Sequence, residues 1–489
     1  MNLADVLLGA ARDTPDAVAL LGARGSTSFA ELGAGAARLA GVLLEVDVPP
    51  DGRVALVSPN SEAFVTAYLA TLHAGAICVP LNPSAPPAAL ERELDAIEPH
   101  LVLAAGPGMS LVAAAGHAVQ AVDLDALPPD EAPRAERRPD DVAVLLFTSG
   151  TAGTPHAAML THANLAANLH QVQEHPGLAL RADDVGLAAL PCFHVFGLNV
   201  VVGVGLAAGA TTVLVERFDP AAVVQLVGEH GVTVLAGVPT MFEEWLALDA
   251  TAAPRDAFAR IRLAVSGAAP LAAEVAAAFE DRFGVVLHQG YGLTEASPIV
   301  TTTALSPTRP RPGSIGRPLP GVAVRLVDED GVDVLAGDPG EIWVRGPNVF
   351  PGYWRDDAAT ASVLDADGSL HTGDVAVADD DGSLWLVDRR KDLIIVSGFN
   401  VYPAEIEEVL ATRPDVREAA VVGAPSPRTG ETVVAFVVPE PGTDPEPSVL
   451  IAHCAHTMAR YKCPTRVEFV DALPKNPAGK LVRRALTPD

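Results

Sequence analysis

Cysteine is scarce in this chain of 489 residues, and the cysteines present follow no pattern. Their spacing matches neither a metal-binding motif nor a disulfide framework, which argues against both kinds of site. They are scattered as Cys78, Cys192, Cys454 and Cys463. Unpaired cysteines suit a reducing compartment, so we expect the protein to be cytoplasmic.

Positive charge is also in short supply, because 33 Lys and Arg residues stand against 61 Asp and Glu residues. A formal net charge of -28 repels nucleic acid and anionic membranes, so we expect no nucleic-acid partner. The start of the chain lacks the basic residues of a secretory signal. The uncharged stretch 195–215 is about as long as a membrane span. Its glycines, and the β-branched residues at its end, favour a buried helix followed by a buried strand instead. We therefore expect no stable membrane insertion.

Alternating short apolar strands and longer helical patterns fill the first two thirds of the chain. A strand at 53–57 precedes a helix at 62–74 and a strand at 76–79, and the alternation recurs at 231–248 and 261–283. It predicts an α/β fold with parallel sheets covered by helices. The length also exceeds what one hydrophobic core usually supports.

We therefore predict two domains. Residues 1–388 form a large N-terminal domain, with a β-rich subdomain at about 322–388 where the strands shorten and Asp/Gly turns appear. Residues 389–489 form a small mobile α+β domain, of a size usual for a domain. The charged run 388–392 between them is a candidate hinge.

Glycines and hydroxyl residues crowd the segment 148–156, directly after an apolar strand predicted over 142–147. Backbone N–H groups near glycines and small hydroxyl side chains can both hold phosphate oxygens. No Gly-Lys-Ser/Thr follows, which disfavours a P-loop NTPase. An ordinary surface turn is the alternative for this loop alone. The predicted phosphate-binding residues are Thr148, Ser149, Gly150, Thr151, Gly153 and His156.

This segment resembles the signature of the adenylate-forming superfamily, which includes acyl-CoA synthetases, adenylation domains of peptide synthetases and luciferases. Other blocks of that family follow in the same order over nearly the whole chain, at 190–198, 266–271, 289–295, 340–346, 352–354, 372–374, 388–392, 403–407 and 474–480. The resemblance implies an ATP-dependent carboxylic acid:CoA ligase. Such an enzyme forms an acyl-AMP with release of pyrophosphate and then transfers the acyl group to the thiol of coenzyme A.

The resemblance also implies roles for individual residues. Lys480 bridges the carboxylate and the α-phosphate, where cations must offset the growing negative charge. Glu295 and Thr151 hold Mg²⁺. The adenine and ribose are contacted by Gly267, Ala268, Ala269, Gln289, Gly290, Tyr291, Gly292, Thr294, Asp374 and Arg389. Each role has a plainer alternative: a surface lysine, an acid at a helix start, a packed tyrosine, a turn aspartate or a surface ion pair.

For the acyl and CoA steps, the resemblance implies a second set of residues. The acyl pocket includes His194, which also counts among the catalytic residues, together with Phe196, Val238 and Ser297. The small domain is expected to rotate about Lys391, bringing the Gly398 region to a pantetheine tunnel. Lys391 is alternatively a plain linker lysine.

The phosphate segment departs from the family pattern at Ala152, His156 and Ala157. His156 stands where the family has a lysine, and a neutral imidazole offers one donor instead of a permanent cation. Losing a charge-assisted hydrogen bond of about 1.5–3 kcal/mol weakens ATP binding roughly ten- to a hundredfold. This predicts impaired ATP use without forbidding it.

The predicted acyl walls at 198–207, 238–242 and 297–301 contain no basic residue. A dicarboxylate such as malonate is therefore disfavoured, as is an amino acid, whose ammonium would want an acidic partner. The motif at 289–298 is most similar to fatty-acid-activating members, so an aliphatic acid is the first expectation and an aryl acid the second.

Two other functions stay open. One is an adenylating enzyme of specialised metabolism that uses an acyl carrier protein or a small anion such as nitrite, and the other is a weakly active nucleotide-binding relative. The oligomeric state is unknown.

Overall fold

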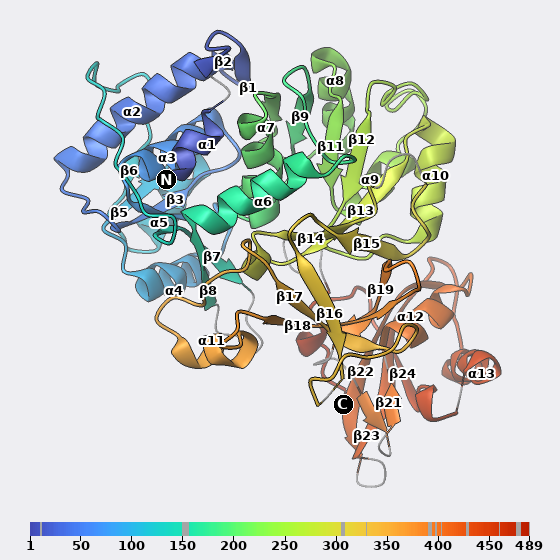
Figure 1. The fold of residues 1–489 in the computed structure, drawn as a ribbon. Helices are drawn as coiled ribbons and strands as arrows, with labels where there is room; N and C mark the ends of the chain where they lie inside the picture. The colour runs from blue at the N-terminus through green and yellow to red at the C-terminus, as the bar shows by residue number, and fades with distance from the viewer. Residues whose placement is uncertain are drawn as a thin grey trace. The chain divides into compact units, whose positions relative to one another are not determined.

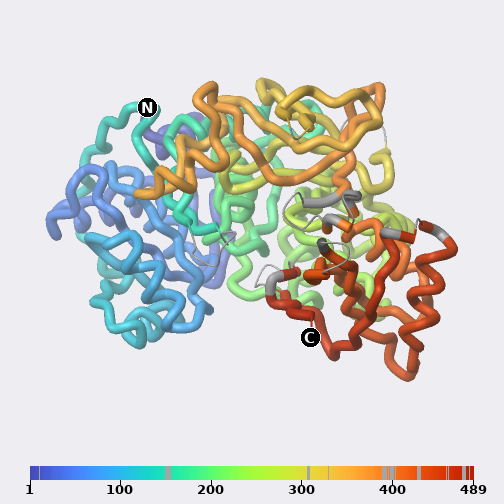
Figure 2. The backbone as a smooth tube through the Cα atoms, turned by 90° about the horizontal axis from the view of Figure 1, so that it is seen from below, coloured from blue at the N-terminus to red at the C-terminus, as the bar shows by residue number. Residues whose placement is uncertain are grey.

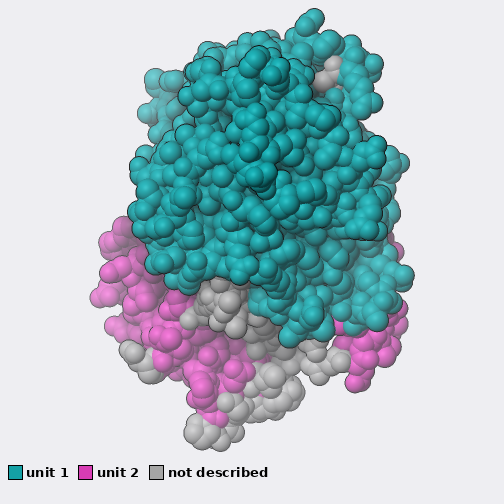
Figure 3. Space-filling view, turned by 90° about the vertical axis from the view of Figure 1, so that its left-hand side faces the viewer, with its two compact units in different colours: residues 1–323, 344–370 teal, residues 324–343, 371–489 magenta. Residues whose placement is uncertain are grey.

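The computed structural model describes the chain except residues 10–11, 149–155, 305–308, 329, 390–393, 397–398, 402, 427–429, 459, 476–480 and 489. The described chain divides into two compact units, coloured separately in Figure 3. Unit 1 comprises Met1–Ala323 and Val344–Leu370, and unit 2 comprises Val324–Trp343 and His371–Asp489. The predicted domain division at 388 stays a prediction.

The first part of unit 1 is a mainly parallel sheet with helices packed against it. Its strands are, in spatial order, β6 (Gln120–Ala121), β5 (Leu101–Ala104), β3 (Arg53–Val57), β4 (Ile77–Leu81), β7 (Val142–Thr148) and β8 (His156–Thr161). Between them run α3 (Glu62–His73), α4 (Pro87–Ile97) and α5 (Pro107–Ala114). Val57, Val79 and Leu145 belong to its buried core. Strands β7 and β8 are antiparallel, and this hairpin carries the predicted phosphate loop.

The second part of unit 1 contains another sheet, which lies beside the first (Figures 1 and 2). Its strand order is β15 (Ser314–Pro318), β14 (Ile299–Thr302), β13 (Leu287–Gly292), β12 (Leu263–Ser266), β11 (Val234–Gly237), β9 (Val185–Ala188), β10 (Thr211–Leu214), β1 (Val18–Gly22) and β2 (Gly25–Ser28). From β1 to β13 the neighbours are parallel. The prediction of an α/β fold is confirmed. In such folds, ligands bind at the carboxyl ends of the parallel strands, where the predicted adenine-side loop follows β12.

Helices occupy the connections in this part of unit 1 and around it. They are α1 (Leu3–Leu7), α2 (Phe29–Glu45), α6 (His162–Glu174), α7 (Val204–Ala207), α8 (Pro220–His230), α9 (Pro239–Ala247), α10 (Ala273–Phe283), the 3₁₀ turn η3 (Thr294–Ala296) and α11 (Asp357–Val363). Trp245 of α9 and Phe279 of α10 are buried in an aromatic cluster with Phe242 and Phe258. This cluster fixes the helices behind the predicted acyl wall.

The uncharged stretch 195–215 forms a helix followed by a strand, as expected. The helix begins with π-type turns, η2 (Phe196–Gly203), continues as α7 and is followed by β10. Sequence periodicity did not indicate the π-helical geometry, a feature often found at functional sites. Within the described residues, every helix is too short or too polar to cross a bilayer.

Unit 2 begins with short antiparallel strands and ends with a small α+β fold. The first group is β16 (Ala323–Val327), β17 (Gly340–Arg345), β18 (Leu370–Ala378) and β19 (Leu384–Arg389). The second group comprises β20 (Ile394–Val396), β21 (Phe399–Val401), α12 (Pro403–Ala411), β22 (Val416–Ser426), β23 (Gly430–Pro439), α13 (Pro447–Thr457), η5 (Arg460–Lys462), β24 (Arg466–Phe469) and η6 (Arg483–Ala485).

Buried apolar residues lie on both faces of the β21-β20-β23-β22 sheet of unit 2. Val433 and Val437 pack with Leu410 and Leu450 of the helices on one face. Val434 and Phe436 pack with Leu473 and other C-terminal residues on the other face. This alternation along β23 follows from the two-residue period of a strand.

Candidate active site

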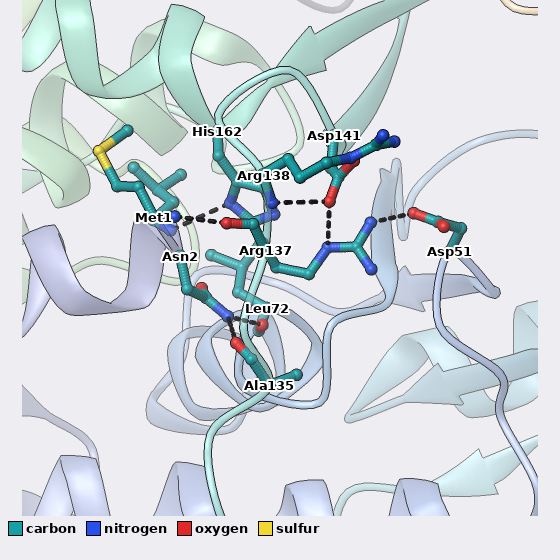
Figure 4. Close-up of polar contacts among 10 residues, drawn as sticks. Met1, Asn2, Asp51, Leu72, Ala135, Arg137, Arg138, Asp141 and His162 are labelled. Atoms are coloured by element: carbon teal, nitrogen blue, oxygen red, sulfur yellow. Dashed lines mark hydrogen bonds and ion pairs between the residues drawn. The ribbon is translucent and has the colours of Figure 1, made fainter.

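The β7–β8 hairpin is anchored at the end opposite its loop by a buried polar cluster (Figure 4). His162, directly after β8, accepts a hydrogen bond on Nδ1 from the backbone N–H of Leu3 at 3.0 Å. The backbone N–H of His162 donates to the carbonyl of Asp141, directly before β7, at 3.1 Å. Burial lowers the pKa of His162 to about 4. This motif histidine is therefore a neutral residue that fixes the hairpin.

Two arginines complete that anchor. Arg138 donates to both carboxylate oxygens of Asp141 through its backbone N–H at 2.8 Å and its Nε at 2.9 Å. Arg137 pairs with Asp141 at 3.1 Å and with Asp51. Thr161 caps α6 by accepting from the Asn164 N–H at 3.0 Å. The Thr-His part of the motif thus has a structural explanation of its own.

His156 lies at the start of β8, opposite Thr148 in the register of the hairpin. Its Nδ1 is 3.0 Å from Oδ2 of Asp356, whose Oδ1 caps α11 by accepting from the Ala359 N–H at 2.9 Å. The two groups lie within ion-pairing distance, so Asp356 is the acidic partner of His156 in the structure.

Sequence reasoning missed this acidic partner, because Asp356 lies far along the chain. The phosphate-binding role of His156 stays a prediction. The ring of His156 also contacts the ring of Tyr353, with centroids 5.2 Å apart.

Glu295 lies in η3, which contacts strand β8 of the hairpin. The hydroxyl of Tyr353 donates to its Oε1 at 2.7 Å. Within the described part of the chain, no residue donates to the other oxygen, Oε2. The carboxylate therefore has one oxygen fixed and one available.

The loop after β12 requires glycine at position 267. A Cβ there would lie 2.9 Å from the ring of Phe196 and 3.3 Å from the carbonyl oxygen of Gly290. Ala268 follows with a positive φ of 66°, a conformation that is uncommon for residues other than glycine. The structure thus brings the predicted adenine-side loop, Phe196 and β13 together.

Strand β13 holds the other predicted nucleotide residues. The side-chain amide of Gln289 accepts from the Leu271 N–H at 3.2 Å and donates to the Ser314 carbonyl at 3.0 Å, so it is committed to fixing backbone. Tyr291 is buried, and Thr294 begins η3. A Cβ on Gly292 would lie 2.0 Å from the Pro298 carbonyl oxygen, which explains the glycine.

The predicted acyl wall is apolar and aromatic. Phe196 and Val238 are half-buried, and His194 contacts Phe193 with ring centroids 4.6 Å apart. Burial lowers the pKa of His194 to about 4, so its imidazole is neutral at physiological pH. Ser297 is completely buried, and its φ of 70° places it in the left-handed region.

Buried amides that the sequence analysis missed fix this wall. Asn199 of η2 donates to the Ser297 carbonyl at 2.8 Å. Asn168 of α6 donates to the Ile299 carbonyl and accepts from the Ile299 N–H, at 2.9 and 3.1 Å. Asn164 and Asn168 stand four residues apart, so they lie on the same face of a partly apolar helix. This spacing was the available sign that both amides are buried.

In unit 2, the two predicted ribose residues lie on neighbouring strands. Asp374 of β18 and Arg389 of β19 are direct partners in the antiparallel register. Asp374 is 8% exposed, and its backbone N–H donates to Thr372 Oγ1 at 3.1 Å. The side chain of Arg389 lies outside the described atoms, as do the predicted site residues Ser149, Gly150, Thr151, Gly153, Lys391, Gly398 and Lys480.

The described residues on either side of 476–480 are firmly held. Lys475 forms a bridge with Leu481, and its Nζ is 2.6 Å from Oε2 of Glu418. Arg483 binds both oxygens of Glu407 at 2.6 and 2.9 Å. The segment that carries Lys480 therefore starts and ends at fixed points of unit 2.

Similar proteins agree with this arrangement. A family model described as AMP-binding enzyme matches residues 8–354, and one for the AMP-binding enzyme C-terminal domain matches residues 405–480. Feruloyl-CoA synthase of an Amycolatopsis species is 40% identical over 483 residues, which cover 97% of this chain and 96% of that protein. Long-chain-fatty-acid–CoA ligase of Yersinia pestis is 43% identical over 354 residues, covering 71% of this chain and 61% of that protein.

Solved structures show the same likeness. ATP-bound MatB from Rhodopseudomonas palustris gives a TM-score of 0.91 at 34% identity, covering 99% of this chain and 98% of that chain. The o-succinylbenzoate CoA synthetase of Bacillus subtilis with its acyl-adenylate gives 0.88 at 30% identity, covering 99% and 98%. The chain therefore belongs to the AMP-binding enzymes of the adenylate-forming superfamily and is an ATP-dependent acid–thiol ligase.

Proposed function

We propose that this ligase activates an aryl-substituted monocarboxylic acid, such as a hydroxycinnamic acid, and transfers it to coenzyme A. The observation that carries this choice is the acyl wall, where the half-buried ring of Phe196 lies against Gly267 beside the neutral His194. A flat ring can stack on Phe196, and a neutral imidazole can form a hydrogen bond without attracting a second carboxylate. The likeness to feruloyl-CoA synthase along nearly the whole chain supports the same class.

A fatty acid is the second candidate. It is favoured by the 43% identity with the long-chain-fatty-acid–CoA ligase over 354 residues. The walls at 198–207 and 238–242 are apolar enough for an alkyl chain. Malonate is disfavoured because these walls contain no basic residue, although the MatB fold is closely similar.

For the first half-reaction, we propose that Lys480 neutralises the carboxylate and the α-phosphate as they meet. Positive charge is otherwise scarce, since residues 1–390 contain no lysine. Glu295 and Thr151 would hold Mg²⁺, which would offset the negative charge of the phosphates. The available Oε2 of Glu295 fits a hard cation that prefers oxygen ligands.

The remaining nucleotide contacts follow from the same positions. Tyr291 would lie against adenine, and Asp374 with Arg389 would bind the ribose, as their paired register allows. His156, which lies beside Asp356, would bind the outer phosphates. For the second half-reaction, unit 2 would turn about Lys391, so that Lys480 withdraws and the Gly398 region guides the CoA thiol.

An acid panel tests this proposal. Pyrophosphate release and acyl-CoA formation would be measured with hydroxycinnamates, benzoates, fatty acids, malonate, amino acids and nitrite, with and without CoA. We expect the highest kcat/KM for hydroxycinnamates and CoA-dependent thioester formation. A clear preference for long-chain acids would overturn the aryl assignment, and pyrophosphate release without any CoA thioester would point to another acceptor.

A further inference from the structure

Residues 347–354, which we name the bridging segment, are bound to helix α6 and to the η3 turn. Asn164 of α6 donates to the carbonyls of Pro347 and Val349 at 2.9 and 2.8 Å. Asn348 donates to the Ala296 carbonyl at 2.8 Å. The N–H of Phe350 donates to the Glu295 carbonyl at 2.9 Å. The bridging segment therefore holds the backbone of the turn that carries Glu295.

The other end of the bridging segment is bound to β8, the strand that leaves the predicted phosphate loop. The N–H of Met159 donates to the Gly352 carbonyl at 3.0 Å, and the N–H of Trp354 donates to the Ala157 carbonyl at 2.8 Å. Gly352 has a φ of 140°, and a Cβ there would lie 2.5 Å from the Thr360 methyl carbon. The backbone path is thus fixed between the phosphate hairpin and Glu295.

Tyr353 is the residue of this segment that reaches the Glu295 side chain. It is 8% exposed, and its ring packs edge-on against Phe350 with centroids 4.9 Å apart and beside His156 at 5.2 Å. Its hydroxyl donates to Glu295 Oε1 at 2.7 Å. The Glu295 carboxylate can only accept, so the Tyr353 hydroxyl is the donor of this bond.

We propose that Tyr353 is a positioning residue for the metal-binding carboxylate: its hydroxyl holds Oε1 of Glu295 so that Oε2 faces the Mg²⁺ of the bound nucleotide. This inference rests on the proposed magnesium role of Glu295. Glu295 sits on a single 3₁₀ turn, and its side chain has several rotamers of similar energy. A charge-assisted hydrogen bond from a rigid, packed ring selects one of them. Preorganisation of this kind spares the carboxylate an ordering cost when the metal binds.

The test is the substitution Tyr353→Phe, which keeps the ring and removes the hydroxyl. Tyr68→Phe is the matched control, because Tyr68 is a 1% exposed tyrosine of α3 elsewhere in unit 1. The Kd of ATP would be measured by calorimetry in Mg²⁺ and in EDTA. We expect the Mg²⁺-dependent gain in affinity to be roughly three- to tenfold smaller in Tyr353→Phe, the cost of ordering one side chain, with the Kd in EDTA unchanged.

An equal loss in Mg²⁺ and in EDTA would overturn the proposal, because it would show that the hydroxyl only supports packing. An unchanged Mg²⁺-dependent gain, or no such gain in the unsubstituted protein, would overturn it as well. A double-mutant cycle with Glu295→Gln adds a second criterion: in that background, Tyr353→Phe should have no further effect on the Mg²⁺-dependent gain. A persisting effect would show that Tyr353 does not act through Glu295.

This binding assay requires neither acid nor CoA. If the unsubstituted protein binds ATP more tightly with Mg²⁺ but forms no acyl-CoA from any acid, the proposed function fails while the role of Tyr353 is still decided. If acyl-CoA forms and the Tyr353→Phe protein keeps its full Mg²⁺-dependent gain, the positioning role fails alone.

Discussion

Replacing His156 with lysine should improve the use of ATP. In the structure, Nδ1 of His156 lies 3.0 Å from Oδ2 of Asp356, at the start of the strand that follows the predicted phosphate loop. A lysine is a permanent cation with three donors, so it can pair with Asp356 and still donate to a phosphate oxygen.

The size of the gain follows from two opposing interactions. A hydrogen bond between a charged donor and a phosphate contributes about 1.5–3 kcal/mol. The new lysine would also pair with Asp356, whose side chain is 36% exposed, and an exposed pair of this kind holds it back by no more than about 1 kcal/mol. The net gain is about 0.5–2 kcal/mol, or roughly a two- to thirtyfold lower KM for ATP.

The assay is the initial rate of pyrophosphate release against ATP concentration, at saturating acid and CoA. The KM for ATP should be lower in His156→Lys than in the unsubstituted enzyme, and the KM of the acid should be unaffected. An equal or higher KM for ATP in His156→Lys would show that a cation at position 156 does not reach the phosphates.

Three further outcomes are expected. The pKa of the folded His162 ring is lowered to about 4, so between about pH 6.5 and pH 4 the unfolded chain binds a proton there that the folded chain does not. The free energy of unfolding should therefore fall by up to about 3 kcal/mol as the pH drops through this interval. Urea titrations should show a smaller fall for His162→Gln, and an equal fall would argue against this residue. In Gly267→Ala the new Cβ would lie 2.9 Å from the Phe196 ring, so the ring should shift toward the acyl site and raise the KM of the acid roughly tenfold, with less effect on that of ATP. A larger effect on ATP would contradict this. Lys480→Ala should slow acyl-AMP formation roughly 100- to 1000-fold but leave CoA transfer from prepared acyl-AMP intact, and equal losses in both steps would contradict its assigned role.

Local sequence patterns predicted the strands and helices well, and the reason is visible in β3 and β7. Buried parallel strands are short apolar runs, so 53–57 and 142–147 stood out without any partner being known. Asp374 and Arg389 were assigned to one sugar from motif positions alone, and the register places them opposite each other. The π-type turns of η2 left no such mark, because periodicity scarcely separates them from an α-helix.

Contacts between distant segments were beyond the reach of the sequence analysis. Tyr353, whose hydroxyl binds Glu295, lies in the bridging segment, and Asp356, the partner of His156, lies just after it. Both follow their partners far along the chain. The buried amides of Asn168 and Asn199 likewise bind backbone more than ninety residues away. Side-chain amides at such positions resemble ordinary surface residues until the fold supplies their partners.

The most direct test of the two-step ligase is a single-turnover reaction followed by mass spectrometry. The protein would be mixed with ATP, Mg²⁺ and a hydroxycinnamic acid without CoA, and CoA would be added afterwards. The account predicts that acyl-AMP and pyrophosphate form in equal amounts, and that CoA then converts the acyl-AMP to acyl-CoA and AMP. Formation of ADP and phosphate, or acyl-CoA without a preceding acyl-AMP, would contradict it.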